Sequence, residues 1–210
     1  MPQEDNNHIP KALTKPDRKD PFHTKMGPKW DKIRTVLSGA DALREAGEKY
    51  TPRFEQEDDK TYKRRLAKTD LTNVLEDTIE NAVAKPFSEP LKIDEANSTE
   101  EYIEWAKDID RQGSDLSTFA EDVFYQSIAD GLGYILADSP DIGSEPLTVK
   151  RQKDENIRPF LLFIDAPSML AFRRSNVNGA LVPTYIRYIV ESTDFDEDSK
   201  PIEVKTVHEI

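Results

Sequence analysis

The spacing of apolar residues changes along the chain, and this change limits the possible folds more than any other feature of the sequence. Between about residues 30 and 130, apolar side chains recur every three or four positions, which is the period of an amphipathic helix. After residue 133, short apolar runs and alternating patterns follow, as in β-strands. We therefore predict an α+β fold in which the N-terminal helices (about 30–130) pack with a mainly antiparallel sheet from the C-terminal part.

Several segments of the first part have both a helical pattern and a recognisable beginning or end. The segment from Trp30 has an apolar stripe and stops at Gly47, and Ser98-Thr-Glu-Glu101 has the spacing of a capping box. Pro86 disfavours helix in the residue ahead of it. The predicted helices cover residues 30–46, 57–68, 69–85, 99–109 and 116–130.

The second part contains the strand signals. Asn178-Gly179 is a strong hairpin turn, and we expect a second turn over Asp194–Ser199. A long surface loop is predicted over residues 139–157. The predicted strands are Phe87–Ile93 at a sheet edge, Tyr134–Ala137, Phe160–Ile164, Ala171–Arg174, Val182–Ser192 and Ile202–Ile210. Because the last of these still alternates at Ile210, we expect the natural protein to continue beyond it.

The N-terminal 28 residues have a different composition. They hold five prolines among charged and amide side chains, too little apolar area to offset the entropy of ordering. We therefore predict two parts: a disordered N-terminal arm over residues 1–28 and one α+β region over residues 29–210.

Composition excludes several classes of protein. The net charge of −12 and the isoelectric point near 4.8 argue against a general nucleic-acid binder, which needs cations to displace counterions from phosphates. The chain has no cysteine, so disulfides, thiolate catalysis and thiolate zinc sites are excluded. No apolar run approaches the roughly 20 residues that span a bilayer, and no signal peptide is evident. We expect an intracellular soluble protein without membrane contact.

A search for catalytic and cofactor motifs gives no candidate. His8, His23 and His208 are far apart in sequence and have no companion at metal-ligand spacing. Gly131-Leu-Gly133 lacks the third glycine of a dinucleotide loop and follows a predicted helix instead of a strand. Asp194–Ser199 begins like a calcium loop but has no glycine at its sixth position. We predict no enzyme activity, no cofactor and no metal, and we assign no catalytic, binding or interface residue.

Two charged groups have alternative interpretations. Lys63-Arg64-Arg65 could contact phosphate, but pairing with the acidic Glu57-Asp58-Asp59 one or two turns earlier is favoured. Abundant carboxylates leave open a metal-dependent nuclease, although most lie on the polar faces of predicted helices. Its candidate ligands are Glu101, Asp108, Asp110, Asp122 and Asp138.

The order of several short segments over roughly residues 30–192 resembles the N-terminal half of a portal-like protein family of tailed bacteriophages. The segments are Tyr50-Thr-Pro-Arg-Phe-Glu55, Tyr62-Lys-Arg-Arg-Leu66, Ala84-Lys-Pro-Phe87, Asp110-Arg-Gln-Gly-Ser-Asp-Leu-Ser-Thr-Phe-Ala120, Gly131-Leu-Gly-Tyr-Ile-Leu-Ala-Asp138-Ser-Pro140 and Arg158-Pro-Phe160. No catalytic residues come with this resemblance, because the ATPase of the packaging motor is a separate protein.

The resemblance implies a structural subunit of a portal ring, the homo-oligomeric channel for DNA packaging and ejection at one capsid vertex. Its implied partners are about eleven further copies of the chain in a closed ring, the capsid protein, the terminase motor and the head-tail adaptor. Duplex DNA would pass without tight binding, and the location would be the virion, after assembly in the host cytoplasm. Residues 29–210 would form a truncated part of the ring's wing. An adaptor or minor head interaction module is the alternative, followed by a nuclease.

Overall fold

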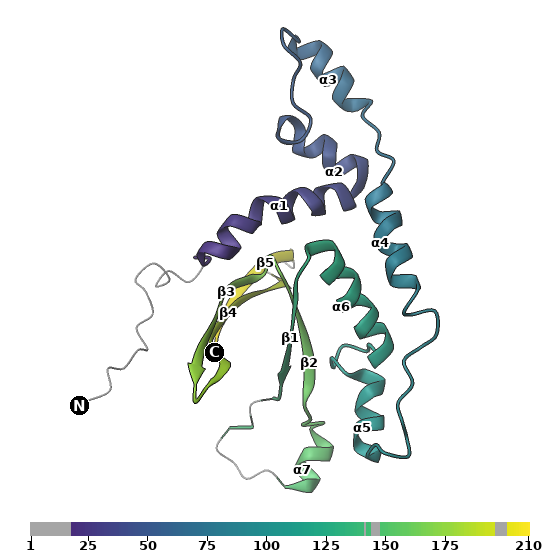
Figure 1. Ribbon diagram of the computed structural model, residues 1–210, viewed down its shortest axis with the longest axis vertical. Coiled ribbons are helices and arrows are strands. Elements are labelled where there is room, and N and C mark those ends of the chain that lie inside the picture. Colours follow the sequence, from purple (N-terminus) through teal and green to yellow (C-terminus); the bar gives the residue numbers. More distant parts are fainter. Residues whose placement is uncertain (1–17, 141, 144–147, 196–200) are drawn as a thin grey trace, which may run out of the picture. The chain divides into compact units, whose positions relative to one another are not determined.

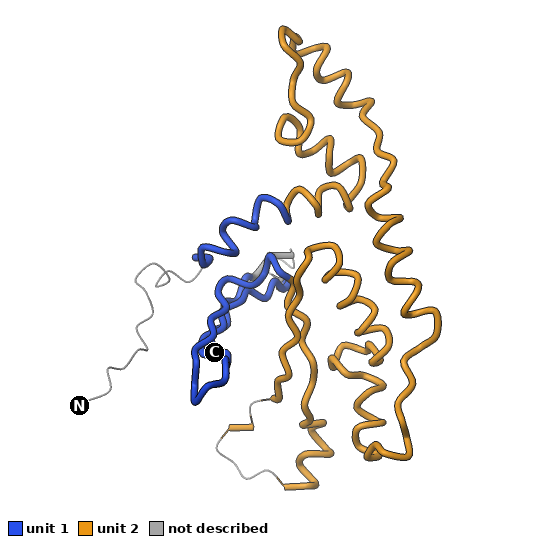
Figure 2. Tube along the Cα trace, in the orientation of Figure 1, with its two compact units in different colours: residues 1–30, 166–210 blue, residues 31–165 orange. Residues whose placement is uncertain are grey.

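The fold is mixed α+β, with seven α-helices followed or interrupted by antiparallel strands in the part of the chain that is described (Figure 1). This computed structural model describes residues 18–140, 142–143, 148–195 and 201–210. The chain divides into two compact units, residues 31–165 and residues 1–30 with 166–210 (Figure 2). The predicted fold class is therefore confirmed: helices dominate the N-terminal part and antiparallel sheets the C-terminal part.

Residues 31–165 contain most of the helices and a two-stranded sheet. Helix α1, Pro21–Leu37, ends in this unit. The other elements are α2 Gly39–Ala46, η2 Gly47–Lys49, α3 Asp59–Ala67, α4 Val74–Ala84, α5 Glu100–Trp105, η3 Ala106–Asp108, α6 Leu116–Asp130, β1 Gly133–Asp138, α7 Val149–Asp154 and β2 Phe160–Asp165. Strand β1 pairs antiparallel with β2, so that Gly133 faces Asp165 and Asp138 faces Phe160.

The core of this unit lies where α4 packs on α6 and α6 packs on the β1–β2 pair. Ile79, Val83 and Ala129 are buried together, and the half-buried Leu37, Phe87 and Tyr125 pack around them. At the edge of this core, Arg34 joins three elements: its guanidinium lies 2.7 Å from Asp130 at the end of α6 and 2.8 Å from Asp165 at the end of β2. The amphipathic stripes seen in the sequence therefore form this core.

Gly133 has a packing role that explains its place in the Gly131-Leu-Gly133 segment. A Cβ atom there would lie 2.5 Å from Ser127 Oγ and 2.8 Å from the Phe163 ring, closer than real Cβ atoms come. A side chain at this position would have to displace the Ser127 hydroxyl and the Phe163 ring where β1 begins against α6 and β2.

Several predicted boundaries were wrong because local hydrogen bonds decide where helices begin. The single helix predicted over residues 30–46 is broken at Ser38, between α1 and α2, because Gly39, where α2 begins, has a φ of +83° that lies outside the range of a continuous right-handed helix. Helices α3 and α4 begin later than predicted, because the side chains of Asp58 and Asn73 accept the first free amides. Helix α5 is capped by Thr99 instead of Ser98, and α7 lies within the predicted loop of residues 139–157.

The predicted edge strand over Phe87–Ile93 is also wrong. This segment forms turns and irregular backbone in the structure. Pro86 and Pro90 remove two backbone donors, and the Leu91 amide donates to the Ser117 hydroxyl of α6 instead of to a strand.

The second unit is built on a three-stranded antiparallel sheet in the order β3-β4-β5. The strands are β3 Met169–Val177, β4 Ala180–Phe195 and β5 Pro201–Glu209. Asn178 and Gly179 join β3 to β4 with φ values of 53° and 86°, which confirms the predicted hairpin turn. Part of the turn predicted over Asp194–Ser199 lies outside the described residues.

Helix α1 begins at Pro21, so the prediction of a disordered arm up to residue 28 is wrong for residues 21–28. Asp20 caps the helix: its Oδ1 accepts the His23 amide at 2.9 Å, and its Oδ2 accepts the Phe172 amide of β3 at 3.3 Å. The Asp20 amide in turn donates to Leu170 O at 2.7 Å. Asp followed by Pro is a typical helix start, a signal that composition concealed. Residues 1–17 of the predicted arm lie outside the described part.

No helix among the described residues is both long enough and apolar enough to cross a membrane.

Candidate functional site

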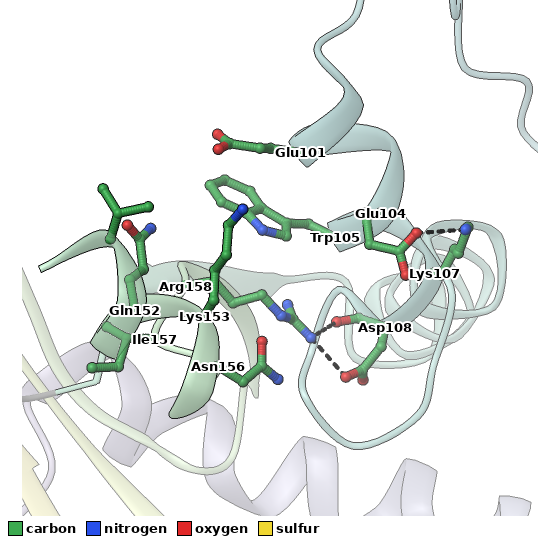
Figure 3. Close-up of a pocket in the computed structure, with 11 residues that line it drawn as sticks. Glu101, Glu104, Trp105, Lys107, Asp108, Gln152, Lys153, Asn156, Ile157 and Arg158 are labelled. Atoms are coloured by element: carbon green, nitrogen blue, oxygen red, sulfur yellow. Dashed lines mark hydrogen bonds and ion pairs between the residues drawn. The ribbon is translucent and has the colours of Figure 1, made fainter.

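A cavity of about 480 Å³ lies between the α5–η3 segment and the α7 segment of residues 31–165 (Figure 3). Glu101 and Trp105 project from α5 toward Gln152 of α7. The cavity is lined by Glu101, Glu104, Trp105, Lys107, Asp108, Val149, Gln152, Lys153, Asn156, Ile157 and Arg158. Its wall therefore combines an indole face with side chains of both charges.

The floor of the cavity is held by an ion pair between Arg158 and Asp108. Only 7% of the Arg158 side chain is exposed, and its guanidinium donates to Asp108 Oδ2 at 2.6 Å and to the Asp108 carbonyl. Asp108 Oδ1 accepts the Gly113 amide at 2.8 Å. Two contacts therefore converge on the Asp108 carboxylate and a third on its backbone carbonyl, and together they attach the loop after η3 to the segment that enters β2.

The loop after η3 is folded by its own hydrogen bonds. Burial raises the pKa of Asp110, but hydrogen bonds from Ser114 and Gln112 outweigh it and leave the pKa below its ordinary value. The Arg111 guanidinium lies 5.8 Å from the centre of the Phe160 ring, and the Leu161 amide donates to Ile109 O at 2.9 Å. This loop is thus fixed to the start of β2 by its backbone, by a cation–π contact and by the Asp108–Arg158 pair.

Two charged side chains of the cavity remain available. Within the described part of the chain, Glu101 and Lys153 have neither an ion-pair nor a hydrogen-bond partner, while Glu104 is paired with Lys107. The cavity can therefore bind a polar or zwitterionic group against the Trp105 indole. No side chain here forms a nucleophile–base pair within the described residues.

The five carboxylates considered for a nuclease do not form a metal site. Glu101 lines the cavity, Asp108 at the end of η3 pairs with Arg158, and Asp110 in the following loop accepts the Gln112 amide. Asp122 is exposed on α6, and Asp138 accepts the Ser139 amide at the end of β1. Among the residues that the structure describes, no group of three or more His, Asp or Glu side chains could hold a metal ion.

The histidines also lie apart. His23 is buried beside Asp20, with Nδ1 2.7 Å from Oδ1, and the ring of His208 stacks on Tyr188. His8 and most of the calcium-like segment Asp194–Ser199 lie outside the described residues.

A second cluster joins the two segments Tyr50–Glu55 and Tyr62–Leu66. Arg65 donates to both oxygens of Glu57 at 2.9 and 2.8 Å, and its guanidinium lies 4.3 Å from the Phe54 ring centre. The buried Tyr62 donates to Thr51 O at 3.2 Å. The predicted pairing of the basic run with the acidic run is confirmed for Arg65 and Glu57.

Acid is expected to weaken this cluster over a defined pH range. The hydrogen bonds from Arg65 lower the pKa of Glu57 from 4.5 to about 2. A depressed pKa contributes stability that is complete above pH 4.5 and is lost as the pH falls from 4.5 through 2. We therefore expect the stability difference between the wild type and Glu57→Gln, measured by urea unfolding from pH 7 to pH 2, to shrink below pH 4.5. A difference that stays constant over this range would contradict the assigned bond.

Sequence reasoning missed Trp105, Lys153 and Gln152 as neighbours. The helical spacing assigns Trp105 only to the apolar stripe of a helix, and no sequence pattern indicates α7. The sequence singles out Arg158 only as part of the segment Arg158-Pro-Phe160. The sequence does contain a signal for the Asp108–Arg158 pair, because an arginine beside a strand that becomes buried needs a counter-charge. The sequence does not show which of the many acidic side chains is that counter-charge.

No protein-family model matches the chain, and a search of curated proteins found no match either. Information on function therefore comes from the residues and geometry of this chain.

Proposed function

We propose that the chain is a structural subunit of a portal-like ring of a tailed bacteriophage, part of the channel through which DNA is packaged and ejected. The observation that carries this proposal is the pairing of the segments that resemble the portal family. Tyr50–Glu55 meets Tyr62–Leu66 through Arg65, Phe54 and the adjoining Glu57. The segment Asp110–Ala120 and the residues just before it meet Arg158–Phe160 through Asp108 and Arg111.

These pairings matter because each depends on particular residue types. A bidentate ion pair between arginine and a carboxylate stabilises the contact and fixes the relative orientation of the two side chains. A cation–π contact between a guanidinium and an aromatic ring does the same. The first pairing is local, with Arg65 eight positions from Glu57, whereas the second joins Asp108 to Arg158 across 50 positions. The order of these segments resembles that of the portal family, and their contacts with one another in this chain support the proposal.

Charge and chemistry support the same proposal. A net charge of −12 lets a duplex pass without tight binding, since acidic surfaces repel phosphates. The proposed partners are further copies of the chain, the capsid protein, the terminase motor and the head-tail adaptor, at the capsid vertex of the virion. An adaptor or minor head module shares the acidic composition but not the ring.

Light scattering on size-exclusion chromatography tests the proposal on this chain and on the longest product of its gene. We expect the longest product to elute with the mass of a ring of about twelve copies. A product that stays monomeric over a range of salt and protein concentrations would move the assignment to an adaptor or minor head module.

A further inference from the structure

Charge is distributed very unevenly between two parts of the chain. Residues 70–130, which we call the acidic helical block, hold 16 acidic and 4 basic side chains, so this block alone has a net charge of −12. Residues 166–190 contain three arginines and no carboxylate. The acidic helical block thus carries a negative charge as large as that of the whole chain, whereas residues 166–190 carry a positive charge.

The basic part is the β3–β4 hairpin, whose far end we call the distal hairpin, residues 173–185. Arg174 is exposed and lies 5.1 Å from the Phe172 ring centre, and the half-buried Arg173 lies 5.7 Å from the Tyr185 ring centre. Neither guanidinium has a carboxylate partner within the described part of the chain. In a protein with 41 acidic side chains, two arginines held on aromatic rings and left without an anion are suited to an anion on another molecule.

The distal hairpin also exposes apolar side chains at its tip. Leu181 is 70% exposed and Val177 is 47% exposed, on either side of the Asn178-Gly179 turn. Within its unit, the tip lies away from α1 (Figure 2). Exposed aliphatic side chains beside arginines form the kind of surface that partner proteins cover.

The acidic helical block offers a complementary surface. A cavity of about 230 Å³ opens among its helices, with aliphatic side chains in the wall and Asp115 at its edge. The lining residues are Pro90, Leu91, Ile93, Ile103, Ala106, Lys107, Asp115, Leu116 and Ser117. A leucine side chain could enter this cavity while carboxylates of the block face the two arginines.

We propose that the distal hairpin of one copy docks on the acidic helical block of a second copy of this chain. The two surfaces are different, so the contact is heterologous and repeats from copy to copy, which generates a ring when the rotation closes. This inference rests on the proposed function, because it requires that copies of the chain assemble. Duplex DNA is a poorer partner for the hairpin, since two arginines neutralise few phosphates and the aliphatic tip gains nothing from a phosphate backbone.

Charge reversal on the longest gene product tests the contact. We expect Arg173→Glu with Arg174→Glu to weaken self-association at least about tenfold at 0.15 M salt, because like charges would face each other. The matched control is Lys63→Glu with Arg64→Glu, the same change of charge at two exposed positions of α3, which we expect to assemble as the wild type does. Circular dichroism melts show whether each variant is folded.

Disulfide formation tests the position of the contact. Because the chain has no native cysteine, any disulfide must form between introduced cysteines. Two differently tagged chains, Leu181→Cys and Leu91→Cys, are mixed and oxidised. We expect a cross-link between the two tags, and none when Leu181→Cys is mixed with Lys63→Cys.

The outcomes separate the two proposals. Wild-type rings together with folded reversal variants that fail to assemble support the inference. Wild-type rings with reversal variants that assemble normally, or that lose only retention of duplex DNA, overturn the inference and leave the portal assignment standing. Wild-type protein that does not assemble at all overturns both.

Discussion

Replacing Asp108 with alanine is expected to lower the free energy of unfolding by about 3–4 kcal/mol, because it leaves the guanidinium of Arg158 buried without a counter-charge. Arg158 would keep the backbone carbonyls of Asp108 and Pro159 as neutral acceptors, and the Gly113 amide would lose its acceptor. We expect Arg158→Ala to lower the free energy of unfolding less, by about 2 kcal/mol. The reason is that Asp108 is 38% exposed, so water can solvate the carboxylate that this change leaves unpaired. Urea unfolding followed by circular dichroism measures both values.

The control for this pair is Lys107→Ala in the neighbouring ion pair with Glu104. Both side chains of that pair are well exposed, so its loss is expected to change stability by less than about 0.5 kcal/mol. If Asp108→Ala cost no more than Lys107→Ala, the Asp108–Arg158 pair would not be what holds the loop after η3 to β2.

Replacing Trp30 with alanine is expected to lower the free energy of unfolding by about 3–5 kcal/mol, the range for removing a large buried aromatic side chain. Trp30 is 1% exposed, and its ring lies 5.9 Å from that of His23 and 6.3 Å from that of Phe22. The loss is expected because removal of the indole leaves a cavity that surrounding side chains fill only in part. Circular dichroism melts and urea titration measure it without relying on the indole fluorescence that the change removes.

Phe22→Ala is the matched control, since Phe22 belongs to the same ring cluster but is 51% exposed. We expect it to cost about 1 kcal/mol or less. Equal losses for the two changes, or a loss below 1 kcal/mol for Trp30→Ala, would mean that α1 is not anchored through Trp30 as the structure has it.

The sequence predicted the parts of the fold that depend on periodic apolar residues. The stripe of α6, the β1 and β2 strands and the Asn178-Gly179 hairpin were all expected, because burial of one face leaves a pattern that can be counted. The starts of α1, α3 and α4 were missed, since a single side chain decides each of them: Asp20, Asp58 and Asn73. Capping residues are common in loops, and a pattern does not show which of them meets a free amide.

The candidate site was largely beyond sequence reasoning. The pairing of Asp108 with Arg158 joins residues 50 positions apart, and any of the many acidic side chains could have served. Only the fold of the loop after η3 selects among them. The distal hairpin, by contrast, is visible in the sequence once charges are counted by segment, because residues 166–190 contain no carboxylate in an otherwise acidic chain.

We propose that copies of this protein form a ring around a channel, and electron microscopy of the longest gene product tests this proposal. The proposed function predicts class averages of closed rings of about twelve subunits around a central opening. Class averages that show only single subunits, or assemblies without a central opening, would contradict it.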